Sequence, residues 1–184
     1  MGTDTAISTP IPTGTWTLDP VHSSAGFAVK HMVVATFRGR FERFDATLVA
    51  DDGGARLEGT VDVDSIVVND ESLAGHLKSP EFFDVERHPV LSFTSRDLRR
   101  SGDELAIDGE LTIKGRTRPI EARGTITGPV VGLGDAERVG LTLEAVIDRR
   151  EYGLDWNAPL PKGGNAIGEE VTLTVHLEMR RKEE

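Results

Sequence analysis

Cysteine is absent from the 184 residues of the chain, which excludes disulfide bonds, thiolate metal sites and cysteine nucleophiles. Long apolar runs are absent too, since none approaches the roughly 20 residues that a membrane-spanning helix needs. The first residues, MGTDTAISTPIPTGTW, contain neither the basic nor the apolar region of a secretory signal. We therefore expect a cytoplasmic protein with no integral membrane segment.

Positive charge is scarce relative to negative charge. The chain has 21 Lys and Arg residues against 31 Asp and Glu residues, giving a formal net charge of −10. A nucleic-acid-binding protein should be basic, so this class is excluded. The same charge disfavours adsorption on anionic lipid surfaces. Local basic clusters, such as Arg38, Arg40 and Arg43, are interpreted as parts of a solvated surface.

Motifs for nucleophilic and phosphate chemistry are also missing. Asp19, His22 and Ser23 lie close together in DPVHSS, but side chains so near in sequence seldom converge into a catalytic triad. The sequence has no G-x-S-x-G elbow and no phosphate-binding loop of the P-loop or Rossmann type. We predict no catalytic residues.

The five histidines show no metal-ligand spacing, because none of them forms H-x-H or H-E-x-x-H. We therefore predict no metal site and no cofactor. Two alternatives stay open at this point. His22, His31 and His76 could converge in space and serve a metal-assisted or acid/base enzyme. The chain could also be a non-catalytic stress-response barrel that holds no ligand.

Apolar residues alternate with polar ones over most of the chain, which is typical of strands with one buried face. Turn sequences rich in Gly, Asp and Pro separate about eight such segments, and this pattern predicts an antiparallel sandwich or barrel. Residues 1–13 lack periodicity and are expected to form a flexible arm. The remainder, residues 14–180, is expected to form a single domain.

One segment departs from the alternation. In NDESLAGHLKSPEFFD, Asn69 or Asp70 can cap a helix on which Leu73 and Leu77 share a face, and Pro80 would end it. We predict a short helical insertion near residues 70–83.

Five ordered sequence blocks resemble those of a known family. They are WTLDPVHSSAGFAVKHMVV, RGRFERFDATL, HLKSPEFFDVERHPVLSFTS, GELTIKGRTRPIEA and the closing pair IDRREYGL and GEEVTLTVHLE. From about residue 15 to residue 178, the chain resembles the YceI-like, lipocalin-like polyisoprenoid-binding family. The resemblance implies an all-β fold, an eight-stranded antiparallel barrel with a helical lid. It further implies an apolar cavity that holds a long isoprenoid lipid, such as a polyprenyl diphosphate or an isoprenoid quinone. The resemblance also implies that the protein carries or stores this lipid rather than catalysing a reaction. Members of the family are often homodimers, so a homodimer is expected.

The resemblance and the alternation together predict which side chains meet the lipid. The expected cavity residues are Phe27, Val29, Phe44, Phe82, Phe83, Leu91, Phe93, Leu111, Ile113, Leu141 and Leu173. The polar head group is expected at the barrel mouth, where the candidates are His22, His31, His76, Lys114, Arg116 and Arg149.

Overall fold

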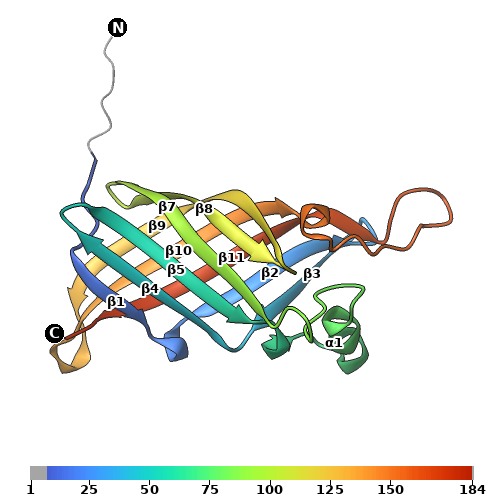
Figure 1. Cartoon of the computed structure of the whole chain (residues 1–184), viewed down its shortest axis with the longest axis horizontal. Helices are drawn as coiled ribbons and strands as arrows, with labels where there is room; N and C mark the ends of the chain where they lie inside the picture. The colour runs from blue at the N-terminus through green and yellow to red at the C-terminus, as the bar shows by residue number, and fades with distance from the viewer. Residues whose placement is uncertain (1–7, 184) are drawn as a thin grey trace, which may run out of the picture.

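The computed structural model describes residues 8–183, which form a long antiparallel β-barrel with one short helix at its side (Figure 1). The strands in chain order are β1 (Gly14–Leu18), β2 (Ser24–His31), β3 (Ala35–Phe41), β4 (Phe44–Asp51), β5 (Gly54–Asp62), β6 (Ile66–Val67), β7 (Val90–Ser101), β8 (Glu104–Ile113), β9 (Arg116–Val131), β10 (Glu137–Asp148) and β11 (Ile167–Arg181). Four short 3-10 helices connect them: η1 (Pro20–His22), η2 (Val63–Ser65), η3 (Leu133–Asp135) and η4 (Arg149–Tyr152).

Eight of these strands close the barrel in the order β1-β4-β5-β7-β8-β9-β10-β11, and pairing of β1 with β11 completes the ring. Trp16 of β1 lies opposite Arg181 on one side and Leu48 on the other. All the pairings are antiparallel, as alternating strands joined by short turns require. The predicted eight-stranded antiparallel barrel is therefore confirmed.

The other three strands extend the wall at one end. Residues 167–176 of β11 pair with β2, β2 pairs with β3, and β3 pairs with the two-residue strand β6. The helix α1 (Glu71–Lys78) follows β6 and lies beside this extension (Figure 1). We call β2, β3 and β6 the flap, and this end of the molecule the lid end.

The helix begins where its sequence predicts. Asp70 is the N-cap, and its carboxylate accepts a hydrogen bond of 2.8 Å from the backbone N–H of Leu73. The helix is shorter than the predicted insertion because Ser79 is its C-cap and Pro80 follows. Residues 79–88 form tight turns instead, held by bonds such as Phe83 N–H to the Leu77 carbonyl.

Residues 1–7 of the predicted arm lie outside the described residues, whereas residues 8–13 run along the barrel. Thr9 pairs with the end of β7 and the turn after it: its backbone N–H donates to the Arg100 carbonyl, and its hydroxyl oxygen accepts from the Gly102 N–H. The indole N–H of Trp16 donates to the Pro12 carbonyl at 3.0 Å, and Ile11 packs on the core. This part of the arm is therefore attached to the barrel.

The core has two parts. At the end of the barrel away from the lid, Trp16, Leu48, Ile126 and Met179 are fully buried and fill the interior. At the lid end, the buried side chains come from the barrel wall, α1 and the turns after it. Helix-side residues such as Leu77 and Phe82 belong to this second cluster. No helix within residues 8–183 is long and apolar enough to cross a bilayer.

Candidate functional site

Two chambers lie inside the barrel, one behind the other. The larger one, about 570 Å³, is enclosed by the flap, α1 and the first part of β11, and we call it the lid chamber. The smaller one, about 160 Å³, lies further into the barrel, and we call it the deep chamber. Phe41, Leu91 and Leu173 line both, so the chambers meet at these three side chains.

The order of side chains along β10 shows how the interior changes with depth. Val139 and Leu141 are packed in the core, Leu143 and Ala145 line the deep chamber, and Ile147 lines the lid chamber. All five point inward because successive residues of a strand alternate between its faces. The barrel is therefore filled at one end and hollow at the other.

The deep chamber exists because small residues occupy the wall. Ala46, Gly59, Ala122 and Ala145 line it, and none of them reaches far into the barrel. The wall atoms exposed inside are almost all apolar. A chamber of this kind can accept a hydrocarbon chain but offers nothing to a charged group.

The lid chamber combines an aromatic wall with a few polar groups. The rings of Phe27 and Phe41 lie 5.9 Å apart, and Phe41 meets Phe83 edge-on at 6.2 Å. The ionisable side chains on its wall are Lys30, His31, His76 and Arg149. Most of the polar surface inside the cavity therefore lies at the lid end.

Arg149 is the most unusual of these groups, since only 4% of its surface is exposed. Its Nε donates to the Gly168 carbonyl at 2.8 Å, its Nη1 donates to the carbonyls of Leu154 and Trp156, and its Nη2 makes one long contact of 3.5 Å with the Ile167 carbonyl. Burial lowers the pKa of this guanidinium from its ordinary value.

Asp148, Asp155 and Glu169 act on Arg149 through charge alone, without a direct ion pair. Asp148 and Glu169 both pair with the exposed Arg150 instead, and no ion pair of Arg149 is found among residues 8–183. A buried cation held only by carbonyl dipoles can still attract an anion placed beside it. The Nη2 group is the side of the guanidinium with the weakest protein contact.

His76 lies between two aromatic rings at the edge of the lid chamber. Its ring meets Phe82 at 4.9 Å and Trp156 at 4.7 Å, both edge-on, and its Nε2 contacts the Glu81 carboxylate. Because α1 carries His76 and the loop after η4 carries Trp156, this stack joins α1 to the loop before β11.

Ten of the eleven predicted cavity residues line the chambers. Phe27, Val29, Phe82, Phe83 and Ile113 lie on the lid chamber, Phe44, Phe93 and Leu111 on the deep chamber, and Leu91 and Leu173 on both. Leu141 is the exception: it is 1% exposed and lines neither chamber, because it lies at the filled end of the barrel among core side chains. That these residues contact a ligand stays a prediction.

The head-group candidates divide in the same way. His31, His76 and Arg149 line the lid chamber, whereas His22, Lys114 and Arg116 line neither chamber. The Lys114 ammonium donates to the carbonyls of Pro80 (2.9 Å) and Gly153 (3.3 Å) and so ties the turn after α1 to η4. Arg116 is exposed beside Gly153.

Several lining residues were not predicted. Trp156 lies in the irregular loop before β11, where no periodicity indicates which side chains point inward. Lys30 falls on the outer face by alternation, but it is the second-last residue of β2, at the mouth, and lines the chamber there. Phe37 and Phe41 share a face of β3, and their alternating spacing was the signal that could have identified them.

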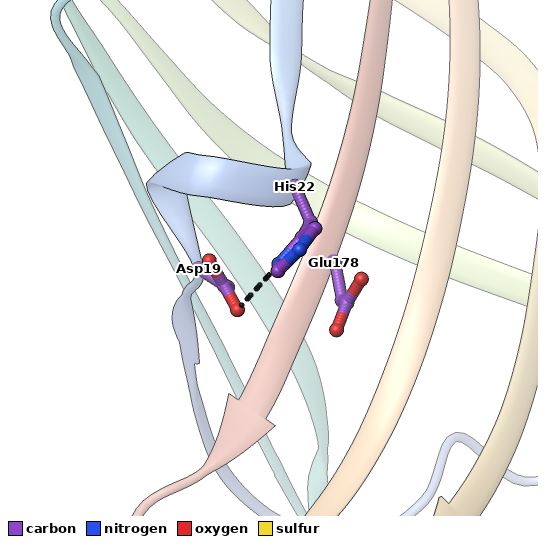
Figure 2. A group of neighbouring side chains, drawn as sticks. All are labelled: Asp19, His22 and Glu178. Atoms are coloured by element: carbon purple, nitrogen blue, oxygen red, sulfur yellow. Dashed lines mark hydrogen bonds and ion pairs between the residues drawn. The ribbon is translucent and has the colours of Figure 1, made fainter. Parts of the chain in front are cut away.

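Another group of polar residues, Asp19, His22 and Glu178, lies where η1 meets β11 (Figure 2), and none of the three lines the lid chamber. The imidazole Nδ1 of His22 in η1 donates a 3.1 Å hydrogen bond to the Asp19 carboxylate, and Glu178 of β11 lies beside them. Ligand atoms of these three residues are within 4.8 Å of one another, as a metal site would need. However, Arg138 Nη1 already bridges Asp19 (3.0 Å) and Glu178 (2.7 Å), so a cation is present between the carboxylates.

The charges in this cluster shift the titration of its members. The hydrogen bond from His22, with a further one from Arg138, lowers the pKa of Asp19 to about 2. The bond to Asp19 in turn raises the pKa of His22 above its ordinary value. The cluster acts as an ion-pair network that fixes η1 to β11.

Comparison with known proteins agrees with this architecture. The model of the YceI-like domain matches residues 16–179. A UPF0312 protein of Staphylococcus aureus (strain USA300) is 29% identical over 170 residues, covering 89% of this chain and 95% of the relative, and one of Staphylococcus epidermidis is 29% identical over 167 residues, covering 87% of this chain and 94% of the relative. The crystal structure of Burkholderia cenocepacia BcnA has a TM-score of 0.75 at 21% identity, covering 88% of this chain and 98% of that one. A polyisoprenoid binding domain from Saccharophagus degradans has a TM-score of 0.67 at 14% identity, covering 91% of this chain and 98% of that one. Because the family model spans the barrel from Trp16 to Met179, the chain belongs to the YceI-like domain family.

Proposed function

We propose that the protein binds a long-chain isoprenoid lipid in the lid and deep chambers, for carriage or storage. The observation that carries the proposal is the distribution of polarity inside the barrel. Almost all of the surface inside the deep chamber is apolar. The acids that border this chamber, Asp45, Glu58 and Glu144, are exposed residues of the barrel wall, whereas the lid chamber has four ionisable residues on its wall. This arrangement is complementary to an amphiphile with a long apolar chain and a polar group at one end.

The energy of such binding comes from burial of the chain. Each methylene-sized group transferred from water contributes about 0.8 kcal/mol, so a few isoprene units suffice for tight binding. The chambers meet at Phe41, Leu91 and Leu173, which gives the chain a path from the mouth into the barrel. The polyisoprenoid binding of the Saccharophagus domain, which has the same fold, supports a ligand of this class.

The head group is placed at Arg149 and His76 in this proposal. The guanidinium of Arg149 is buried, lines the lid chamber and has no ion pair among the described residues. An anionic head would satisfy its Nη2 group with charge-assisted hydrogen bonds. We therefore favour a prenyl diphosphate over a neutral quinone.

The enzyme alternative requires His22, His31 and His76 to converge. His22 ends η1 before β2 begins, and His31 is the last residue of β2, whose seven steps of about 3.3 Å from Ser24 to His31 span roughly 23 Å. His31 and His76 do share the lid chamber, but His22 belongs to the Asp19 network outside it. A ligand-free stress-response barrel is disfavoured by the two chambers. A homodimer and a cytoplasmic location stay predictions.

Binding can be followed through Trp156, which lines the lid chamber, while the second tryptophan, Trp16, is buried at the other end. Titration with prenyl diphosphates should change the emission of Trp156, and affinity should rise with chain length.

Phe93→Asp should abolish binding of the longer chains, because a carboxylate in the deep chamber must be desolvated. Ser92→Asp, one residue away on the outer face of β7, is the matched control and should bind normally. Equal binding by the two variants, both folded, would refute the placement of the chain.

A further inference from the structure

The tip of the β2–β3 hairpin exposes three consecutive apolar side chains. Met32 is 44% exposed, Val33 is 71% exposed and Val34 is 87% exposed. Met32 and Val33 also adopt left-handed backbone angles, with φ of 50° and 66°. Such angles favour Gly or Asn and are unfavourable for a β-branched residue like Val33. The chain therefore holds apolar side chains at a turn where polar residues would fold more easily.

This tip forms the lip of the lid chamber. Met32, Ala35 and Thr36 line the chamber from the hairpin, together with Lys30 and His31 just before the turn. The backbone N–H of Met32 donates to the Ala166 carbonyl at 2.7 Å, which attaches the tip to the loop before β11. That loop and the tip project from the same end of the barrel (Figure 1). A molecule entering the chamber at this lip passes the exposed apolar side chains.

The charge of the hairpin differs from that of the whole chain. Residues 20–41 contain no Asp or Glu, although the protein has 31 acidic residues and a net charge of −10. Arg40 is paired with Glu42, and Lys30 borders an outer groove with Glu169 and Glu170 of β11. Arg38 is exposed on β3, and no ion pair of Arg38 is found among residues 8–183. Charges beyond about 8–10 Å are screened at physiological salt, so the local sign governs what docks here.

We propose that the tip at residues 32–34 docks on a lipid bilayer and that anionic head groups strengthen the docking through Arg38. The apolar side chains would enter the boundary between head groups and acyl chains, with the cation at the level of the phosphates. The bilayer is also where a long isoprenoid resides, so docking would bring the mouth of the lid chamber to its cargo. This last step rests on the proposed function, whereas the docking itself does not.

A second copy of the chain fits this tip less well. A two-fold interface would place the same patch of both copies face to face, which would bring Lys30 and Arg38 toward their counterparts. A second exposed apolar tip provides a contrast. Leu133, 95% exposed in η3, follows Val130 and Val131 and is bordered by Asp135 and Glu137. The turn between β9 and β10 that contains η3 lies at the opposite end of the barrel from the β2–β3 tip (Figure 1). Neither chamber is lined by residues of this acidic tip, so of these two tips in the described part of the chain the β2–β3 tip is the one that combines a cavity mouth with positive charge.

The test is co-sedimentation of the full-length protein with vesicles of phosphatidylcholine, with and without phosphatidylglycerol. The wild type should bind, and phosphatidylglycerol should increase the bound fraction in a salt-sensitive manner. The affinity of the double variant Val33→Asn/Val34→Ser for vesicles should be about tenfold lower than that of the wild type, because two apolar side chains no longer enter the bilayer. It should remain folded, because Asn tolerates the left-handed angle at position 33 better than Val. Arg38→Gln should remove only the increase caused by phosphatidylglycerol, and binding to phosphatidylcholine vesicles should stay the same.

Leu133→Ser is the matched control and should bind vesicles like the wild type. A soluble short-chain prenyl diphosphate, titrated without vesicles, should bind the tip variant and the wild type alike, which separates docking from ligand binding. Docking is overturned if the wild type does not sediment with vesicles, or if the tip variant sediments equally. It is also overturned if the tip variant changes only self-association measured by ultracentrifugation. A wild type that does not bind the prenyl diphosphate would instead contradict the proposed function. The vesicle result would still decide whether the tip docks on a bilayer.

Discussion

The ring of Phe27 lies directly against the backbone of Gly39 in the neighbouring strand. A Cβ added at position 39 would lie 2.5 Å from Phe27 Cζ, so no other residue fits while the ring stays in place. Because Phe27 lines the lid chamber, Gly39→Ala should push its ring into the chamber. We expect prenyl diphosphate affinity to fall about tenfold, as if two methylene-sized contacts were lost. Unchanged affinity in Trp156 titrations would show that the ring moves elsewhere.

Filling the deep chamber should separate stability from ligand binding. Ala122 is on its wall, so Ala122→Leu should occupy part of the 160 Å³ and raise the free energy of unfolding by about 1 kcal/mol. The longest chains should then bind less tightly, while short chains that occupy only the lid chamber bind normally. Thr125→Leu, on the exposed face of the same strand, should change neither property. Chain-length titrations and urea denaturation measure the two effects, and equal weakening for all chain lengths would contradict the placement.

Arg149 should be far less tolerant of replacement than its neighbour. Its guanidinium donates to the carbonyls of Leu154, Trp156 and Gly168, and an ammonium cannot reproduce this fork. Arg149→Lys should therefore lower the free energy of unfolding by about 3 kcal/mol, as buried carbonyls lose their donors. Arg150→Lys should cost less than about 1 kcal/mol, because its ion pairs are partly exposed. Similar losses in urea denaturation would argue against the structural role of Arg149.

Tyr152 carries a fully buried hydroxyl that has no hydrogen-bond partner within the described part of the chain. Burial also raises the pKa of this phenol to about 12. Tyr152→Phe removes the unsatisfied oxygen and keeps the ring, so thermal unfolding should show equal or higher stability, by up to about 1 kcal/mol. A clear loss of stability would indicate a partner for the hydroxyl, such as a buried water molecule.

The Asp19 and His22 pair should make stability depend on pH in two windows. Asp19 has its pKa lowered from 3.8 to about 2, so its contribution is present above pH 3.8 and is lost as the pH falls toward 2. The pKa of His22 is raised above 6.5, so its contribution is complete below pH 6.5 and is lost as the pH rises through the folded-state pKa.

Nuclear magnetic resonance titration tests the origin of the His22 shift. Asp19→Asn should move the pKa of His22 down toward 6.5, since the bond to Asp19 is the main cause of the rise. Glu178→Gln should lower it less, because Glu178 acts on His22 through charge alone. Equal shifts in the two variants would contradict this division.

The barrel could be predicted because alternation reports which face of a strand is buried. Leu111, Ile113 and Leu173 point inward for that reason, and the turn sequences fix the strand boundaries. Alternation does not report depth along the barrel axis. Leu141 and Leu143 therefore look alike in sequence, although only Leu143 borders a chamber.

The mouth could be predicted less well because it is built from segments without periodicity. Trp156 comes from an irregular loop, and its inward position depends on contacts with His76 and Phe82 of a distant segment. Lys114 was placed at the mouth for its charge, but its ammonium is used by the carbonyls of Pro80 and Gly153. The polar groups of a mouth are set by how loops pack, which a single sequence does not encode locally.

The central claim is that the two chambers hold a long isoprenoid chain, and mass spectrometry of an organic extract tests it most directly. The protein is purified from cells that make isoprenoids, and a second sample is incubated with polyprenyl diphosphates before extraction. We expect a long-chain isoprenoid in stoichiometric amount, and its loss in Phe93→Asp but not in Ser92→Asp. A wild-type protein that is free of isoprenoid after purification and takes up none of the added lipids would contradict the claim.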